Sequence, residues 1–253
     1  MKAVATPYGE IFVDRGPPGG NMTTERVALE VTNKESYEIT QTGLKVNSDP
    51  LYVIDLEYRA QNPQRMEKPA LLEIEADWQG MARLAGAGNN ILGDNGILGI
   101  HADHLEIPVV NATEESLAYY GAVLLRQGDR ISFPDQKFPI FVMDVGERYV
   151  ENFIMTEQGG GFYLEYHLDK PHFHMLLNGG GYYILAKWND QKRLEITAFR
   201  IQDGDAVYTK KGAIHCDAAL TGKMFVGYDK AEECSTVVLR SGAKQTQVKF
   251  LGT

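Results

Sequence analysis

Hydrophobic and polar positions alternate with a period of two through most of the chain, which is the pattern of β-strands. The alternating segments are short, rich in Val, Ile, Tyr and Phe, and separated by clusters of Gly, Asn, Asp and Pro. A helical turn is expected only at residues 113–117, where Glu114 and Glu115 favour a helix start. The pattern therefore predicts an all-β sandwich or barrel with few short helices. The predicted strands are residues 25–32, 51–60, 70–78, 119–126, 139–145, 161–168, 182–188, 194–199, 223–228, 235–240 and 245–250.

An internal repeat divides the chain into two halves. Short matches recur in the same order, and their offset grows from 108 residues at Leu56 and Leu164 to 114 at His101 and His215. A growing offset fits small insertions in turns between strands of the same order. We therefore predict two similar β domains, residues 1–133 and 134–253, joined near residues 134–139. The paired segments are Leu56-Glu57-Tyr58 with Leu164-Glu165-Tyr166, Pro63 with Pro171, Trp78 with Trp188, Ile100-His101 with Ile214-His215, and Val123 with Val237.

Three histidines of the second half form a candidate metal site. His172 and His174 are one residue apart in an extended segment, so their side chains point to the same face of a strand. His215 follows in a turn-rich frame that could return it to this pair. The run Gly179, Gly180 and Gly181 lies between them. It predicts a flexible hairpin turn, and the alternative is a segment where a ligand approaches the backbone closely.

The spacing of these residues resembles the two motifs of the cupin family, whose members are small β-barrels. The second motif of that family is Gly, five residues, Pro-x-Gly, two residues, His. Here it reads Gly204, five residues, Lys210-x-Gly212, two residues, His215, so only the Pro differs. The first motif, His-x-His followed by Glu, keeps both histidines, but Asn178 or Gly179 stands at the place of the Glu.

What this resemblance implies is a double-barrel cupin whose second barrel holds one divalent ion, Zn or else Fe, Mn or Ni. The implied ligands are His172, His174 and His215, and the carbonyl oxygen of Asn178 is the candidate fourth ligand. Three imidazoles suit these ions and leave positions open for water or substrate.

The resemblance reaches the first half only through the repeat, which aligns residues 62–65 with the segment of the histidine pair. That pair is absent there, and His101 is the counterpart of His215. His104 and Glu106 lie near His101, but a catalytic metal usually requires three protein ligands. We therefore expect residues 1–133 to form a degenerate barrel without a metal.

Several side chains near the histidine pair are candidates for proton transfer. Glu165 and His167 share one face of the preceding strand, and a solvated outward pair is the alternative interpretation. Tyr183 belongs to a group of tyrosines that would line a site for a polar ligand. Asp217 could orient an imidazole, although Asp103 at the equivalent place in the first half favours a shared structural role equally.

Three functions are compatible with this candidate site. The first is a metal-dependent lyase or isomerase that acts on a small, oxygen-rich, carbohydrate-derived substrate through Lewis-acid and general acid/base catalysis. The second is a non-haem iron dioxygenase, and the third is a non-catalytic cupin that binds a sugar or another metabolite. The chain lacks a phosphate-binding glycine loop, a Gly-x-Ser-x-Gly elbow and a Cys-x-x-Cys pair.

Composition limits the partners and the location. The net charge of −9 and the lack of a Lys and Arg cluster in the sequence argue against nucleic acid as a partner. No apolar run is long enough for a membrane span, and no secretory signal is recognised at the start. Cys216 and Cys234 are expected to be reduced thiols of a cytoplasmic protein. Cupins commonly pair through edge strands, so a homodimer is predicted, and a monomeric sedimentation mass would contradict it.

Overall fold

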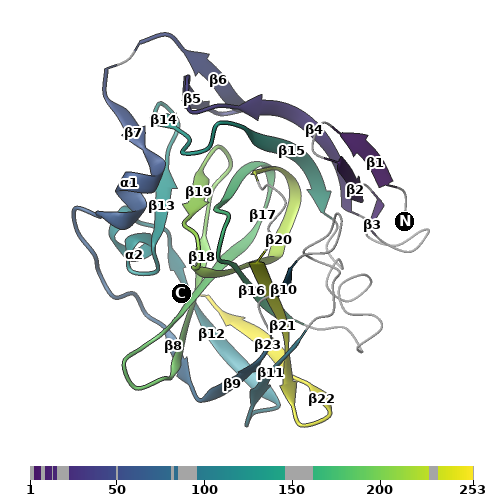
Figure 1. Ribbon diagram of the computed structural model, residues 1–253. Helices are drawn as coiled ribbons and strands as arrows, with labels where there is room; N and C mark the ends of the chain where they lie inside the picture. Colours follow the sequence, from purple (N-terminus) through teal and green to yellow (C-terminus); the bar gives the residue numbers. More distant parts are fainter. Residues whose placement is uncertain are drawn as a thin grey trace.

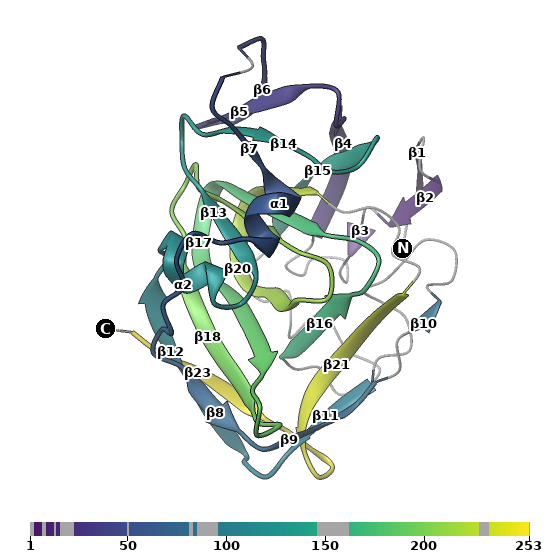
Figure 2. The same ribbon diagram turned by 60° about the vertical axis from the view of Figure 1, so that its left-hand side comes forward.

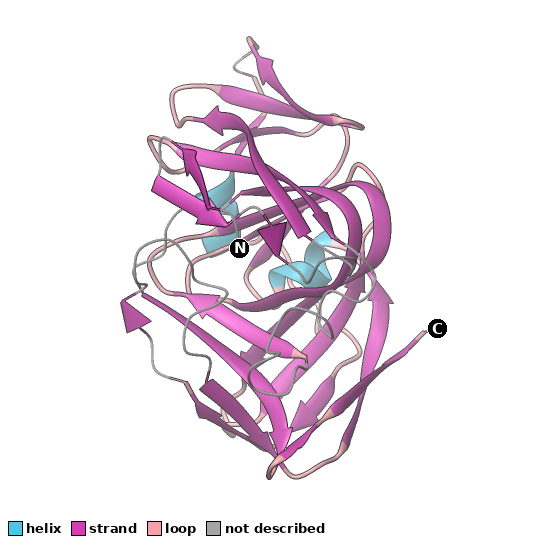
Figure 3. Cartoon of the chain, turned by 90° about the vertical axis from the view of Figure 1, so that its right-hand side faces the viewer, coloured by secondary structure: helices cyan, strands magenta, loops and turns pink. Residues whose placement is uncertain are grey.

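Strands dominate the structure, a computed structural model that describes residues 3–6, 9–12, 14–15, 23–49, 51–80, 83–84, 96–145, 162–227 and 233–252 (Figure 1). Strand is the predominant colour of the described chain in Figure 3. The helices among the described residues are α1 and α2, both short. The prediction of an all-β fold with few short helices is therefore confirmed. No helix among the described residues is long and apolar enough to cross a membrane.

The described elements are as follows. The first half contains β1 (Ala3–Thr6), β2 (Gly9–Phe12), β3 (Asp14–Arg15), β4 (Thr23–Val31), β5 (Ser36–Thr40), β6 (Gly43–Asn47), β7 (Val53–Asp55), α1 (Leu56–Gln61), β8 (Leu72–Ile74), β9 (Ala76–Gln79), β10 (Arg83–Leu84), β11 (Gly96–Ile100), β12 (His104–Asn111), α2 (Glu114–Ala118), β13 (Ala122–Leu125) and β14 (Arg130–Ser132). The second half contains β15 (Phe138–Val145), β16 (Tyr163–His167), β17 (His172–Trp188), β18 (Leu194–Arg200), β19 (Ala206–Thr209), β20 (Ile214–Gly227), β21 (Glu233–Ser241), β22 (Lys244–Gln245) and β23 (Gln247–Leu251).

A long antiparallel ribbon of β17 and β20 connects two layers of strands. The beginning of β17 and the end of β20 lie in one layer, together with β15, β19, β13 and β4. The end of β17 and the beginning of β20 lie in the other layer, together with β18, β16 and β21. Both strands curl as they pass from layer to layer (Figure 1). The ribbon therefore brings its two ends face to face.

Two hydrophobic clusters lie on opposite faces of the layer that contains the start of β17. Phe173 and Met175 belong to one cluster, which α1 and the separate four-stranded sheet β6-β5-β14-β7 also contact. Leu176 and Tyr183 belong to the other, larger cluster between the two layers. Since side chains alternate along a strand, His172 and His174 share the face opposite to Phe173, which directs them between the layers.

The strand predicted at residues 51–60 is wrong over its second half, where α1 forms. Asp55 caps this helix, because its Oδ1 accepts a hydrogen bond of 2.9 Å from the backbone N–H of Tyr58. Leu56 and Ala60, four residues apart, are the buried positions of the helix. The helix predicted at residues 113–117 is confirmed as α2, with Thr113 as its N-cap.

The two predicted halves share both layers. Strands β4 and β13 extend the first layer, whereas β8, β11 and β12 pair with strands of the second. One pair of repeated segments also differs in structure, because Leu56 begins a helix and Leu164 lies in a strand. The division into domains 1–133 and 134–253 stays a prediction.

Glycines allow the ribbon to bend where it passes between the layers. Strand continues through Gly179, Gly180 and Gly181, so the predicted hairpin turn is wrong. Gly181 has a φ of +107°, and a Cβ there would overlap the carbonyl oxygen of Ala219 on β20. The glycine run therefore serves a close approach of two strands of the protein.

Replacement of Gly181 by alanine is expected to destabilise the fold by about 3 kcal/mol or more, because the added Cβ requires both a strained φ and a backbone shift. Gly180→Ala is the matched control, since its Cβ would meet nothing within 4 Å. It is expected to change the free energy of unfolding by less than about 1 kcal/mol. Urea unfolding of both variants measures the difference, and equal midpoints would contradict the prediction.

Candidate metal centre

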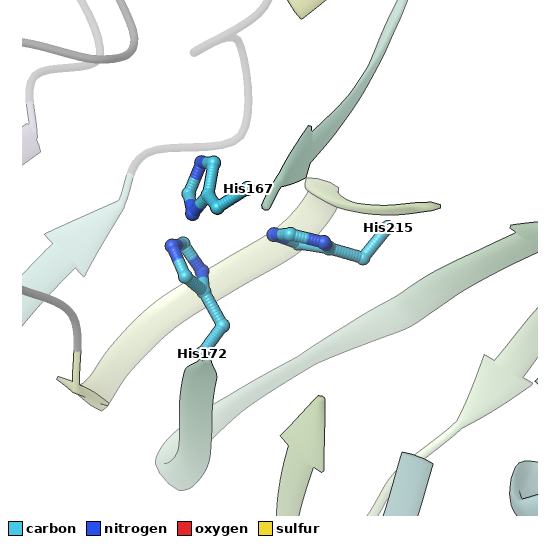
Figure 4. Close-up of side chains that lie close together, drawn as sticks. All are labelled: His167, His172 and His215. Atoms are coloured by element: carbon cyan, nitrogen blue, oxygen red, sulfur yellow. The ribbon is translucent and has the colours of Figure 1, made fainter. Parts of the chain in front are cut away.

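Three buried histidines converge between the two layers. The ligand atoms of His167, His172 and His215 all lie within 4.8 Å of one another. The ring centroids of His167 and His172 are 4.3 Å apart, and those of His172 and His215 are 4.5 Å apart. Figure 4 shows the three rings pointing towards a common centre from three separate segments. We call these residues the histidine cluster.

Strand pairing explains why these histidines meet. In the second layer, Glu165 of β16 pairs directly with His215 of β20, so both side chains point to the same face. His167 is two residues beyond Glu165 on β16 and shares that face. His172 begins β17 in the opposite layer, only five residues after His167. The cluster therefore joins one histidine of the first layer to two of the second.

His215 is oriented for a ligand at its Nε2 atom. Its Nδ1 donates a hydrogen bond of 3.0 Å to the backbone carbonyl of Ala213, which leaves the lone pair of a neutral ring on Nε2. Nε2 is buried and makes no hydrogen bond to the described part of the chain. Burial lowers the pKa of His215 to about 4, and it also lowers the pKa of His172 well below the ordinary value. Neutral imidazoles of this kind are metal ligands.

A buried carboxylate stands beside the histidine cluster. Glu165 Oε1 lies 3.5 Å from His215 Nε2, and Oε2 lies 3.8 Å from His167 Nε2. Only 3% of Glu165 is exposed. The hydroxyl of Thr236 donates to Oε2 over 3.4 Å. The donor set of three imidazoles and one carboxylate fits a divalent transition-metal ion.

His174 lies beside the cluster, but its side chain contacts Asp217. Its Nε2 is 3.3 Å from Asp217 Oδ2, and the hydroxyl of Tyr163 donates to Asp217 Oδ1. Burial raises the pKa of Asp217, but the contacts with His174 and Tyr163 outweigh this effect and lower the pKa to about 2. Asp217 therefore orients an imidazole, that of His174.

Asn178, the predicted fourth ligand, lies outside the buried histidine cluster, and Tyr183, a predicted proton-transfer residue, packs against the cluster. Asn178 is exposed and lies next to an irregularity in the pairing of β17 with β20. The hydroxyl of Tyr183 shares a hydrogen bond of 2.9 Å with Thr209, and burial raises its pKa well above the ordinary value. The Tyr183 ring is stacked on that of His215, with centroids 6.4 Å apart. Tyr183 thus packs against the cluster.

The histidine candidates of the first half are exposed. His101 follows β11, and His104 begins β12, outside the histidine cluster. Glu106 forms a surface ion pair of 3.3 Å with Lys249. Cys216 is a free, buried thiol, and the side chain of Cys234 lies outside the described residues.

Acidification is expected to destabilise the metal-free protein. Between pH 6.5 and 4, His215 is protonated in the unfolded chain but stays neutral in the folded protein. The unfolded state therefore binds more protons in this range. Stability should therefore fall as the pH falls through this window, by about 3 kcal/mol for His215. Urea unfolding of chelator-treated protein at pH 7 and 4.5 measures this. The pH effect should shrink in His215→Gln, and an unchanged effect would contradict the assignment.

Comparisons with known proteins identify no family. No protein-family description matches the chain, and no curated protein matches it. Among solved structures, oxalate decarboxylase from Bacillus subtilis at pH 4.6 is similar with 12% identity and a TM-score of 0.23. A serine-to-alanine mutant of Bacillus subtilis oxalate decarboxylase is similar with 10% identity and a TM-score of 0.22. Each match covers 40% of this chain and 23% of the other. Likeness at this level assigns neither a family nor an activity.

Proposed function

We propose that the chain is a metal-dependent enzyme, a lyase or isomerase that acts on a small, oxygen-rich substrate such as a carbohydrate derivative. The observation that supports this proposal is the buried histidine cluster with Glu165 beside it. A divalent ion held there supplies Lewis acidity, which polarises a carbonyl or hydroxyl oxygen of a substrate.

His167, His172 and His215 would hold the ion, and Glu165 would be the fourth ligand. Ligand atoms of a tetrahedral site with bonds of about 2.1 Å lie about 3.4 Å apart. The separation of 3.5 Å between Glu165 Oε1 and His215 Nε2 is close to that value, and the ligand atoms of the three histidines lie within 4.8 Å of one another. Glu165 and His167, which are predicted from the sequence to transfer protons, would then be ligands of the ion.

His174 would then be the residue that exchanges a proton with the substrate. Asp217 holds its Nε2, whereas its Nδ1 is buried and makes no hydrogen bond within the described chain. The contact with Asp217 fixes the orientation of the ring, as a general acid or base requires. Tyr183 is less suited to this role, since its hydroxyl is bonded to Thr209.

Metal analysis of protein purified without chelators tests the proposal. We expect one divalent ion per chain, and metal-dependent turnover on a panel of sugar-derived and hydroxy-acid substrates. His172→Ala and His215→Ala should lose both properties. A metal-free protein, or unchanged turnover in these variants, would overturn the proposal. Iron together with oxygen consumption would instead favour a dioxygenase, because the same donor set accepts iron.

A further inference from the structure

A hollow of about 500 Å³ lies beside the helices. Four segments meet there: the chain after α1, the turn from α2 to β13, the end of β17, and the turn from β19 to β20. Figure 2 shows α1 and α2 next to β13 on this side of the molecule. Small-molecule sites commonly have volumes of roughly 300 to 1,000 Å³, so the space suits a small ligand.

The hollow is basic although the chain is acidic. Lys187, Lys210 and Lys211 line it, whereas the whole chain has a net charge of −9. The buried carboxylate nearby, Glu195, binds Lys68 at 2.8 Å and accepts a hydrogen bond of 2.6 Å from Tyr119. None of the ion pairs between described residues includes the three lining lysines. We call this space the basic hollow.

Lys187 is held in place by Tyr119 and makes no ion pair with a described carboxylate. Its Nζ lies 3.3 Å from the centre of the Tyr119 ring and donates a hydrogen bond of 3.1 Å to the Tyr119 carbonyl. Burial lowers the pKa of Lys187. Glu195 and Asp190 act against this effect, whereas Lys68 and Lys210 lower the pKa further. An anion near Nζ would compensate this concentration of positive charge.

Apolar side chains line the same space. Trp188 is 38% exposed and Met66 is 64% exposed, and both line the hollow together with Tyr119. Aromatic side chains beside several ammonium groups favour a ligand with an apolar body and an anionic end. We propose that the basic hollow binds a small organic anion, whose carboxylate or phosphate group contacts Lys187, Lys210 and Lys211 and whose body contacts Trp188.

This site is next to the histidine cluster but separate from it. The turn that carries Lys210 and Lys211 also positions two metal-ligand candidates. The N–H of Gly212 donates to the carbonyl of His167 over 2.6 Å, and the carbonyl of Ala213 accepts the bond from His215. The anion itself contacts none of the three histidines, so its binding does not depend on the proposed metal or reaction.

Fluorescence of Trp188 provides the test. The chain has two tryptophans, so Trp78→Phe leaves Trp188 as the reporter in the full-length protein. We expect saturable changes with phenyl phosphate or benzoate, and affinity at least about tenfold higher than for neutral benzamide. A preference between the two anions identifies the head group. Equal affinity for benzamide, or no saturable change with either anion, would overturn the proposal.

Lysine variants locate the bound anion. Lys187→Met combined with Lys211→Met should weaken binding by about tenfold or more. Lys211→Met alone, at an exposed position, should weaken it by about threefold without affecting the fold. The matched control is Lys45→Met on β6, which should bind as the parent does. Unchanged affinity in the lysine variants would overturn the proposal.

A histidine variant separates the two sites. His172→Ala, which removes a proposed metal ligand, should bind the anion with unchanged affinity. If this variant loses anion binding, the anion occupies the metal centre and the basic hollow is not its site. Failure of the proposed enzymatic function would leave the anion affinity of the parent protein unchanged, so the two proposals are tested independently.

Discussion

Replacement of His167 by alanine is expected to lower the affinity for a divalent metal by more than about 100-fold, because it removes one of three converging imidazoles. Loss of an outer-shell partner alone typically costs about 10- to 100-fold, so a direct ligand should cost more. His174→Ala is the matched comparison, and it should change the affinity by less than about tenfold. His174 is as deeply buried as His167, but it faces Asp217.

Competition titration with a chromogenic chelator measures both affinities on protein whose fold is checked by circular dichroism. The two variants distinguish two possible sets of metal ligands. Both sets contain His172 and His215, and the third histidine is His167 in one set and His174 in the other. If His174→Ala loses the metal and His167→Ala keeps it, the ligands are His172, His174 and His215, and the arrangement of the histidine cluster is not the metal-bound one.

The pattern of the sequence predicted part of the strands, but it missed β5, β6, β11, β12 and β19, and it did not show which strands pair. Alternation predicted segments such as 139–145 and 194–199, which form β15 and β18. It failed at α1, because Val, Ile and Tyr near residue 55 have high strand propensity while the Asp55 cap and the spacing of Leu56 and Ala60 favour a helix. Strand propensity and the helix cap at Asp55 are both local features of the sequence, and here the cap decided the structure.

The histidine cluster could be predicted only in part, because one of its members depends on how two strands pair. His172 and His215 stood out by their spacing, and the alternation of Glu165 with His167 was visible too. Whether that pair points inward depends on the register of β16 against β20, where Glu165 pairs with His215 across 50 residues of chain. Register of this kind is set by the tertiary structure, so no local pattern reveals it.

The basic hollow could not be predicted from the sequence, because its lining residues are distant from one another along the chain. Lys187 comes from β17, whereas Lys210 and Lys211 come from the turn after β19, and Tyr119 comes from the end of α2. No run of basic residues marks these positions, and the net charge of the chain has the opposite sign. The pairing of β17 with β20, in which Ala186 lies opposite Ile214, brings Lys187 close to the turn of Lys210 and Lys211.

Glu165→Gln is expected to lower the affinity for a divalent metal by about 100-fold while the fold is retained. Glutamine has nearly the shape of glutamate, and its amide oxygen can still accept the hydrogen bond from Thr236. It removes the negative charge that lies within 4 Å of two imidazoles of the cluster. A neutral oxygen is a weaker ligand for a divalent ion than a carboxylate, so the loss should appear in binding before any turnover is measured.

Asp217→Asn is the matched control for Glu165→Gln, because it neutralises a nearby carboxylate that contacts His174 instead of the cluster. It should leave the metal affinity within about tenfold of the parent value but reduce turnover, since Asp217 holds the proposed proton-transfer residue. Metal content and turnover measured on both variants therefore distinguish a ligand from a base. A Glu165→Gln protein that keeps its metal but loses turnover would return Glu165 to proton transfer, which the sequence predicted, and would leave three histidines as the whole ligand set.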